Sequence, residues 1–144
     1  MENQLDTGYP AENYSGIHLQ LLVNSLVDDS LPTAQRNQSA VINEVGKGVV
    51  IEEGNSHMIL LMGEVIKTII SNSKRGDIHI GAEKAGNKLV LKIQERNNYN
   101  GLALSFSLGT LKPDINFAGG QLDIDDPQKR VTTIYFSFPD RAVA

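Results

Sequence analysis

The 144-residue chain has no cysteine and no tryptophan, and only 6% of its residues are aromatic. The absence of cysteine excludes a disulfide framework, a thiol nucleophile and a cysteine-based metal site. No apolar run approaches the length of a membrane span, and the N-terminus lacks a basic-then-apolar signal pattern, so we expect a cytoplasmic chain without membrane insertion. The net charge is −4, and Lys and Arg are scattered along the sequence. We therefore expect no binding to nucleic acid.

The stretch from Ser56 to Asn72 predicts one buried amphipathic helix. Its apolar residues recur at helical spacing and form a broad stripe. Ser56 is placed to cap the start of this helix, and Gly54 turns the chain before it. A polar column of Glu64, Thr68 and Asn72 follows another face. This column is either the wall of a polar pocket or an exposed helix face.

The rest of the chain predicts a single domain of residues 15–144 behind a polar tail or linker of residues 1–14. A first helix is expected from Ser15, and Pro32 either ends or kinks it. Residues 102–108 alternate like a strand but also suit a helix start, and both alternatives stay open. The strands are expected at residues 39–45, 48–53, 77–83, 88–95, 121–125 and 131–139.

These elements predict an α+β fold. The strands alternate apolar and polar residues, so one face of the sheet is buried and the other is wet or lightly covered. Two amphipathic helices must bury their stripes against something. A two-layer α/β sandwich satisfies both demands, with a mixed, mainly antiparallel sheet covered on one face by helices.

Several motifs in this order resemble the ATP-binding domain of sensor histidine kinases, which has the Bergerat fold of the GHKL superfamily. The resemblance covers about residues 15–139. EVIKTIISNS resembles the asparagine-bearing helix, and the strand ending KIQER resembles the one that delivers the adenine-binding aspartate. GLALS resembles the glycine motif GLGLS. GGQLDID followed by TTIYFSFP resembles the closing signature of the family.

The resemblance implies four site residues. Asn72 matches the asparagine that holds Mg²⁺ against the phosphates, and Glu95 matches the aspartate that reads adenine. Gly101 and Thr133 match retained positions of the ATP pocket. Two simpler interpretations stand beside these. Asn72 is a common helix-terminal residue that satisfies local carbonyls, and Glu95 is a solvated residue at a strand end.

The sequence also departs from the family pattern. Thr68 stands where histidine kinases have Asn and hydrolytic relatives have a glutamate base, and a hydroxyl does not serve as a base for water at pH 7. The two glycines of the adenine loop fall at Asn97 and Tyr99, and we hypothesise that Tyr99 plugs the former pocket. Ala103 and Val131 replace further glycines, and the long lid over the phosphates is missing. No catalytic residue is assigned.

Three hypotheses about function follow. The first is a degenerate histidine-kinase-like domain, a pseudokinase of two-component signalling that needs no cofactor. It would act through contacts with a kinase, a response regulator or a second copy of itself. The alternative is a divergent but functional catalytic domain that binds ATP and Mg²⁺ through Asn72 and Glu95. The third is a relative of the small anti-sigma serine kinases. Whether the chain is an enzyme stays open, because a kinase-type fold does not make it active alone.

Overall fold

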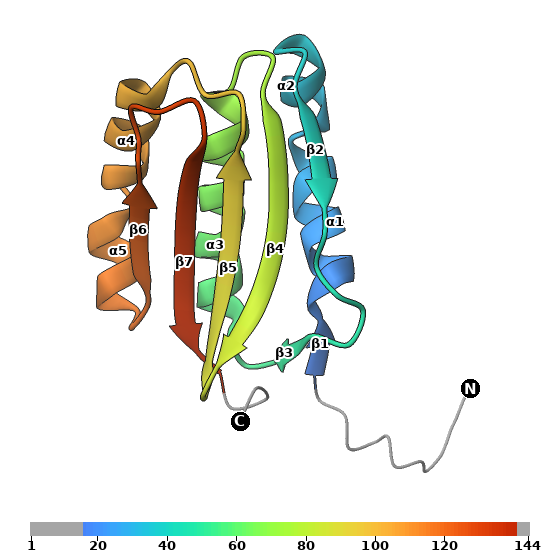
Figure 1. Cartoon of the computed structure of the whole chain (residues 1–144). Coiled ribbons are helices and arrows are strands. Elements are labelled where there is room, and N and C mark those ends of the chain that lie inside the picture. Colours follow the sequence, from blue (N-terminus) through green and yellow to red (C-terminus); the bar gives the residue numbers. More distant parts are fainter. Residues whose placement is uncertain (1–15, 141–144) are drawn as a thin grey trace.

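The computed structural model describes residues 16–140, so the tail expected at residues 1–14 lies outside the described part. A five-stranded sheet forms one layer, and helices cover one of its faces, as Figure 1 shows. The predicted two-layer α+β sandwich is confirmed. Within residues 16–140, no helix combines the length and apolar character that crossing a membrane requires.

Seven strands and five helices make up the described residues. The main sheet has the order β2-β4-β5-β7-β6, in which only the β2–β4 pair is parallel, and β1 pairs with β3 in a separate two-stranded ribbon. The strands are β1 (Gly16–His18), β2 (Ala40–Asn43), β3 (Val50–Glu52), β4 (Asp77–Ala85), β5 (Lys88–Glu95), β6 (Gln121–Asp125) and β7 (Thr132–Pro139). The helices are α1 (Leu19–Asp29), α2 (Leu31–Arg36), α3 (Ser56–Ser71), α4 (Gly101–Gly109) and α5 (Lys112–Phe117).

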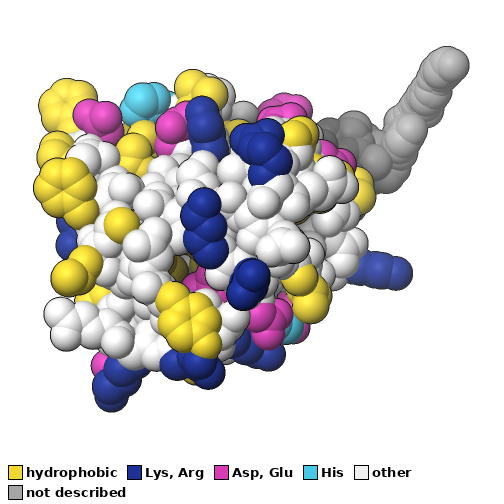
Figure 2. All heavy atoms as spheres, turned by 90° about the horizontal axis from the view of Figure 1, so that it is seen from above, with side chains coloured by type: hydrophobic (Ala, Val, Ile, Leu, Met, Phe, Trp, Pro, Cys, Tyr) yellow, Lys and Arg dark blue, Asp and Glu magenta, His cyan; other side chains and the backbone are white. Residues whose placement is uncertain are grey.

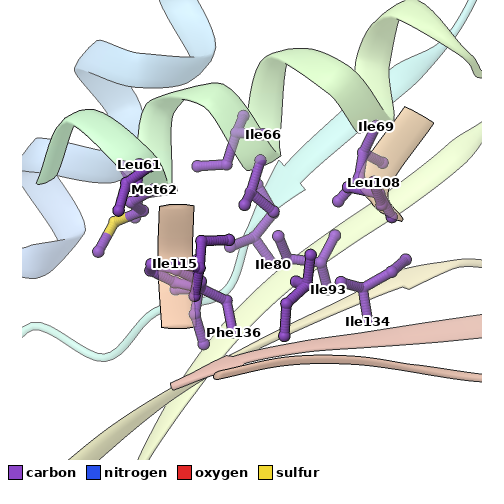
Figure 3. Close-up of a cluster of buried hydrophobic side chains, with 14 of the residues drawn as sticks. Leu61, Met62, Ile66, Ile69, Ile80, Ile93, Leu108, Ile115, Ile134 and Phe136 are labelled. Carbon is purple, nitrogen blue, oxygen red and sulfur yellow. The ribbon is translucent and has the colours of Figure 1, made fainter. Parts of the chain in front are cut away.

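The helix α3 organises the core, as its apolar stripe predicted. Figure 3 shows its side chains lying over those of the central strands. Burying an aliphatic side chain of this size stabilises a fold by about 1.5–3 kcal/mol. The several buried residues of α3 therefore hold the helical layer against the sheet. Its buried residues are Met58, Leu61, Met62, Val65, Ile66, Ile69 and Ile70.

The start of α3 differs from the prediction that Ser56 caps it. Asn55 is the N-cap residue, and Ser56 is the first residue of the helix. Neither side chain caps the backbone, because Asn55 donates instead to the carboxylate of Asp140 at 3.1 Å. Asp140 also accepts the backbone N–H of Glu52. A contact distant in sequence therefore replaces the local cap that we expected.

The first helix does not begin at Ser15 as predicted. Residues Gly16–His18 form β1, which pairs antiparallel with β3, and α1 begins at Leu19. Gly16 allows this pairing because a Cβ there would overlap the side chain of Val50. The two β-rich runs between α2 and α3 therefore do not pair with each other. One joins the main sheet as β2 and the other joins β1 as β3.

The strands expected at residues 77–83 and 88–95 form a hairpin as β4 and β5, with Ala85 paired to Lys88 across a two-residue turn at Gly86 and Asn87. Gly86 has φ +66°, a conformation that glycine adopts freely. Residues 102–108, left open by the sequence, are helical as part of α4. The short α5, which begins at Lys112 and has Pro113 in its first turn, was not predicted.

Candidate functional site

Three loops meet at one end of the sheet, at the top of Figure 1. They are residues 72–76 between α3 and β4, residues 96–100 between β5 and α4, and residues 126–131 between β6 and β7. Asn97 joins the first two, since its Nδ2 donates to the backbone carbonyl of Arg75 at 2.7 Å. Asn98 joins the second and third through its backbone N–H, which donates to the carbonyl of Arg130 at 2.8 Å. Two adjacent residues thus hold all three loops together.

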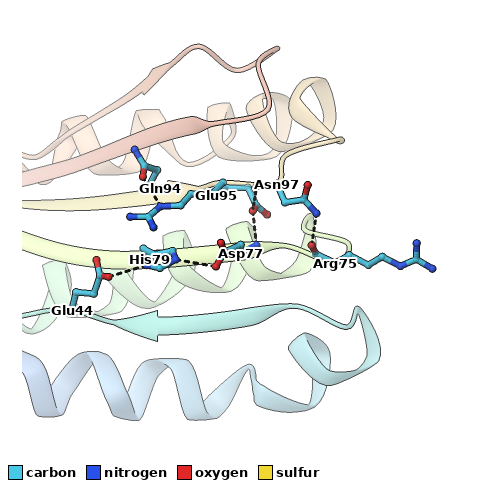
Figure 4. A network of polar contacts seen from close by, with 8 residues as sticks. Glu44, Arg75, Asp77, His79, Gln94, Glu95 and Asn97 are labelled. Atoms are coloured by element: carbon cyan, nitrogen blue, oxygen red, sulfur yellow. Dashed lines mark hydrogen bonds and ion pairs between the residues drawn. The ribbon is translucent and has the colours of Figure 1, made fainter.

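Glu95 lies at the centre of this end, on the inner face of the sheet. It is 1% exposed, so it is not the solvated strand-end residue of the simpler interpretation. Its Oε1 accepts the backbone N–H of Asp77 at 2.8 Å and that of Asn97 at 3.0 Å (Figure 4). A Cβ at Gly76 would overlap its Oε2. The carboxylate therefore accepts hydrogen bonds from the protein's own backbone.

Asn98 is the buried side chain of the loop before α4. Its Nδ2 lies 2.9 Å from the carbonyl oxygen of Pro127, 3.2 Å from that of Lys129 and 2.7 Å from the Thr132 hydroxyl. Its Oδ1 accepts the backbone N–H of Asn100 at 3.1 Å. This one amide holds the 126–131 loop against the start of α4.

Gly101 lies directly under that loop. A Cβ at this position would overlap the carbonyl oxygen of Pro127 and would stand 3.0 Å from Nδ2 of Asn98. The backbone of the 126–131 loop therefore fills the space that a side chain at Gly101 would need. The family resemblance matched Gly101 to a nucleotide-binding glycine. In the structure, the atoms next to Gly101 belong to the 126–131 loop of the same chain.

Asn72 follows the last residue of α3. Its Nδ2 donates to the carbonyl of Thr68 at 2.9 Å, and its own carbonyl accepts from Nδ2 of Asn100 at 3.2 Å. Its Oδ1, the atom that a Mg²⁺ ion would take, has no hydrogen bond to another described residue. Asn72, Thr68 and Glu64 together line an open groove of about 320 Å³ between α3 and α4. The polar column is therefore a groove wall.

Thr133 lies on the opposite face of the sheet from Glu95. The register pairs Glu95 with Thr132, whose side chain is buried on the inner face. Thr133 faces the helix-free side, where its hydroxyl accepts from Nε2 of Gln94 at 3.4 Å. The threonine brought near Glu95 and Asn98 is therefore Thr132. The alternation of β7 in the sequence could have indicated this. Thr132 is two and four residues from the buried Ile134 and Phe136, so its side chain points to the same face as theirs.

Tyr99 does not plug an interior space, so the hypothesis made from its position is wrong. The side chain is 68% exposed, and the guanidinium of Arg130 lies over its ring, 4.5 Å from the centroid. The residue that fills the interior is its neighbour Asn98, which is 9% exposed. An amide is favoured there because it can both donate and accept among the polar backbone groups of the two loops.

A second polar cluster occupies the helix-free face of the sheet. Nδ1 of His79 lies 2.9 Å from Oε2 of Glu44, and its Nε2 lies 2.9 Å from Oδ1 of Asp77 (Figure 4). His79 lies on the face of β4 away from the core. Asp77 lies two residues from His79 on the same strand, whereas Glu44 comes near His79 only because β2 pairs in parallel with β4.

We expect His79→Ala to lower the free energy of unfolding by about 1 kcal/mol, because hydrogen bonds to half-exposed carboxylates contribute little each. Urea unfolding measures the change. Lys92→Ala on the same face is the control, since Lys92 has no hydrogen bond or ion pair to another described residue, and it should stay within about 0.5 kcal/mol of the parent. Equal losses in the two variants would show that the cluster adds nothing.

Neither site assembles a cluster of metal ligands. Within residues 16–140, no group of three or more His, Asp and Glu side chains is arranged to hold an ion. Asn72 is thus the one position at which the resemblance implies a metal contact. An amide oxygen alone is a weak ligand for Mg²⁺, which is usually held by carboxylates together with substrate phosphates.

No protein-family model matches the sequence, and no curated protein does. Solved structures match over most of the chain. The histidine kinase ThkA, in complex with the response regulator protein TrrA, aligns with a TM-score of 0.64 at 13% identity over 86% of this chain. The histidine kinase AdeS of Acinetobacter baumannii aligns with a TM-score of 0.63 at 14% identity over 88% of this chain and 67% of its own. The mycobacterial sensor histidine kinase MprB gives 0.57 at 14% identity, over 88% of this chain and 97% of its own.

The aligned part is only 41% of the ThkA chain, so this chain spans less than half the length of that kinase. By contrast, it covers 97% of the separate catalytic domain of ThkA, at a TM-score of 0.59 and 11% identity. At such identities the likeness concerns the backbone and not the site residues. The chain therefore has the fold of a histidine kinase catalytic domain, the ATP-binding fold that the motifs in its sequence indicated.

Proposed function

We propose that this chain is a histidine-kinase-like domain of two-component signalling that acts through protein contacts and does not use ATP. The observation that carries the proposal is the 126–131 loop over Gly101. The family resemblance implies that this glycine borders the nucleotide, and here the Pro127 carbonyl oxygen fills the space in which a side chain on Gly101 would lie. The loop is held in place by the buried Asn98 amide, so moving it aside would break several hydrogen bonds at once.

The environment of Glu95 supports the same proposal. An adenine-reading carboxylate must keep an acceptor free for the base. Oε1 of Glu95 already accepts two backbone N–H groups, and Oε2 is enclosed beside Gly76. Freeing this carboxylate would leave the N–H groups of Asp77 and Asn97 without a partner, at about 1–3 kcal/mol each. The residues present therefore fit ATP poorly as the family would hold it.

The test is titration calorimetry of the purified chain with ATP and Mg²⁺, with a competent histidine kinase catalytic domain as positive control. We expect no heat and no thermal shift at millimolar ATP. The thermal shift is sensitive, because a ligand present at about 1,000 times its Kd stabilises a protein by about 4 kcal/mol. Micromolar binding that is lost in Asn72→Ala would overturn the proposal.

One observation favours the alternative of a divergent ATP-binding catalytic domain. Oδ1 of Asn72 makes no hydrogen bond within residues 16–140, and Asn72 lines an open groove with Thr68 and Glu64. An ion held there would use Asn72 and the nucleotide's own phosphates. The calorimetric experiment separates the two functions. A cytoplasmic location and the identity of the partner remain predictions for this chain.

A further inference from the structure

The three joined loops gather positive charge that the sequence scatters. Lys74 and Arg75 lie in the first loop, Arg96 in the second, and Lys129 and Arg130 in the third, and all five are exposed. We call these five residues the basic edge. Figure 2 looks onto this end of the molecule, where Lys and Arg side chains cross the middle of the surface. The chain as a whole has a net charge of −4, so the basic edge differs sharply from the rest of the surface.

Most of this charge is unpaired. Lys129 lies 3.5 Å from the exposed Asp126. Lys74, Arg75, Arg96 and Arg130 form no ion pair with any carboxylate in the described part of the chain. The other acidic residues that directly flank the three loops are Glu95, which is buried among backbone donors, and Asp77 and Asp125 at the strand ends. A cationic edge of this kind attracts and orients an oppositely charged partner.

Exposed apolar side chains adjoin the basic edge. Tyr99 and Leu102 are 68% and 71% exposed and line an open hollow with Asn98, Asn100 and Gln128. Arg130 lies over the Tyr99 ring, which fixes its guanidinium in place while leaving it exposed. Arg and Tyr are the residues most enriched at the energetic centres of protein interfaces. Figure 2 shows more hydrophobic side chains beside this area, over α4 and α5.

We propose that the basic edge, with Tyr99 and Leu102 beside it, is the docking surface for an acidic segment of a protein partner. The inference rests on the proposed function, because it names the surface through which a domain that does not use ATP makes its contacts. Aspartate and glutamate side chains of the partner pair with the arginine guanidinium groups, whose planar donors match carboxylates. An apolar partner residue covers Tyr99 and Leu102. Nucleic acid is a poorer occupant, since the rest of this acidic chain repels a long polyanion.

The probe is a fluorescein-labelled synthetic peptide that interleaves Asp and Glu with Leu and Phe, and binding is measured by fluorescence anisotropy. We expect saturable binding that weakens markedly as salt rises from about 50 mM to about 200 mM. The double variant Lys74→Glu/Arg96→Glu should weaken binding by about tenfold or more. The matched control is Lys84→Glu/Lys88→Glu, which makes the same charge change at the hairpin tip, at the opposite end of the sheet. It should stay within about twofold of the parent.

Four outcomes would overturn the assignment. They are no binding of the acidic peptide, an equal loss in both double variants, equal binding of a peptide with lysine in place of Asp and Glu, and tighter binding of a thymidine oligonucleotide. Equal urea midpoints of the variants and the parent establish that each double variant is folded. A salt-sensitive dimer abolished by Lys74→Glu/Arg96→Glu would instead name a second copy of this chain as the occupant. ATP is titrated into the same samples, so that ATP binding refutes the proposed function while peptide binding alone decides the surface.

Discussion

Gly101→Ala is expected to destabilise the chain by about 3 kcal/mol or more, or to prevent it from folding. The added Cβ overlaps the carbonyl oxygen of Pro127 and crowds the Asn98 amide. Both neighbours are held by hydrogen bonds, so the 126–131 loop must shift and release Asn98 from Lys129 and Thr132. Urea unfolding followed by circular dichroism measures the loss.

Gly109→Ala is the matched control, because it lies in the same helix with no atom within 4 Å of the added Cβ. It should be neutral or should stabilise α4 by up to about 1 kcal/mol, since alanine is the better helix former. If Gly101→Ala were as stable as Gly109→Ala, the space above Gly101 would be free. The proposal that the chain's own loop takes the place of a nucleotide would then lose its main support.

Glu95→Ala is the second variant with a large expected effect, a loss of about 3 kcal/mol. It removes a buried carboxylate that accepts two backbone N–H groups, one at the start of β4 and one in the 96–100 loop. Those donors would then be buried without a partner. Because the same carboxylate fixes the loop that Asn97 ties to Arg75, the loss should also increase hydrogen exchange at the basic edge.

Two further variants test the cause of that loss. Glu95→Gln keeps an oxygen in the place of Oε1. It should recover about half of the unfolding free energy that Glu95→Ala loses, since a neutral acceptor forms weaker hydrogen bonds than a carboxylate. Glu83→Ala, at an exposed position of β4, should change stability by less than about 0.5 kcal/mol. Full stability of Glu95→Ala would mean that the carboxylate is dispensable for the fold and is held for another purpose.

Local patterns in the sequence predicted the parts of the fold that local physics determines. The apolar stripe of α3 predicted its buried face, because one helix face lies against the sheet along its whole length. The alternation of residues 77–83 and 88–95 predicted the two strands that form the central hairpin. The family motifs predicted how these pieces assemble, and the solved structures share that backbone.

The errors occurred where distant segments decide the outcome. Gly16–His18 is a strand only because β3 lies beside it. For residues 102–108 the sequence left strand and helix open. Leu102 and Phe106 are exposed on a helix whose buried residues are Leu104 and Leu108. At the candidate site, its match to a family glycine position and its size suggested Tyr99 as the filling residue. The buried residue is Asn98, because the space is lined by carbonyl and hydroxyl oxygens from a loop some thirty positions away in sequence.

The joining of three loops by Asn97 and Asn98 has a consequence for how such a sequence can change. On the proposed function, placing glycines at Asn97 and Tyr99 one at a time would not create a nucleotide site. Asn97→Gly would remove the hydrogen bond to Arg75, and Tyr99→Gly would remove the ring under Arg130, while Asn98 and Pro127 stayed in place. We expect each of these substitutions alone to lower stability without producing ATP binding, because residues that share contacts act non-additively. On the proposed function, several substitutions must therefore be made together before a nucleotide can bind, because Asn97 and Asn98 join all three loops.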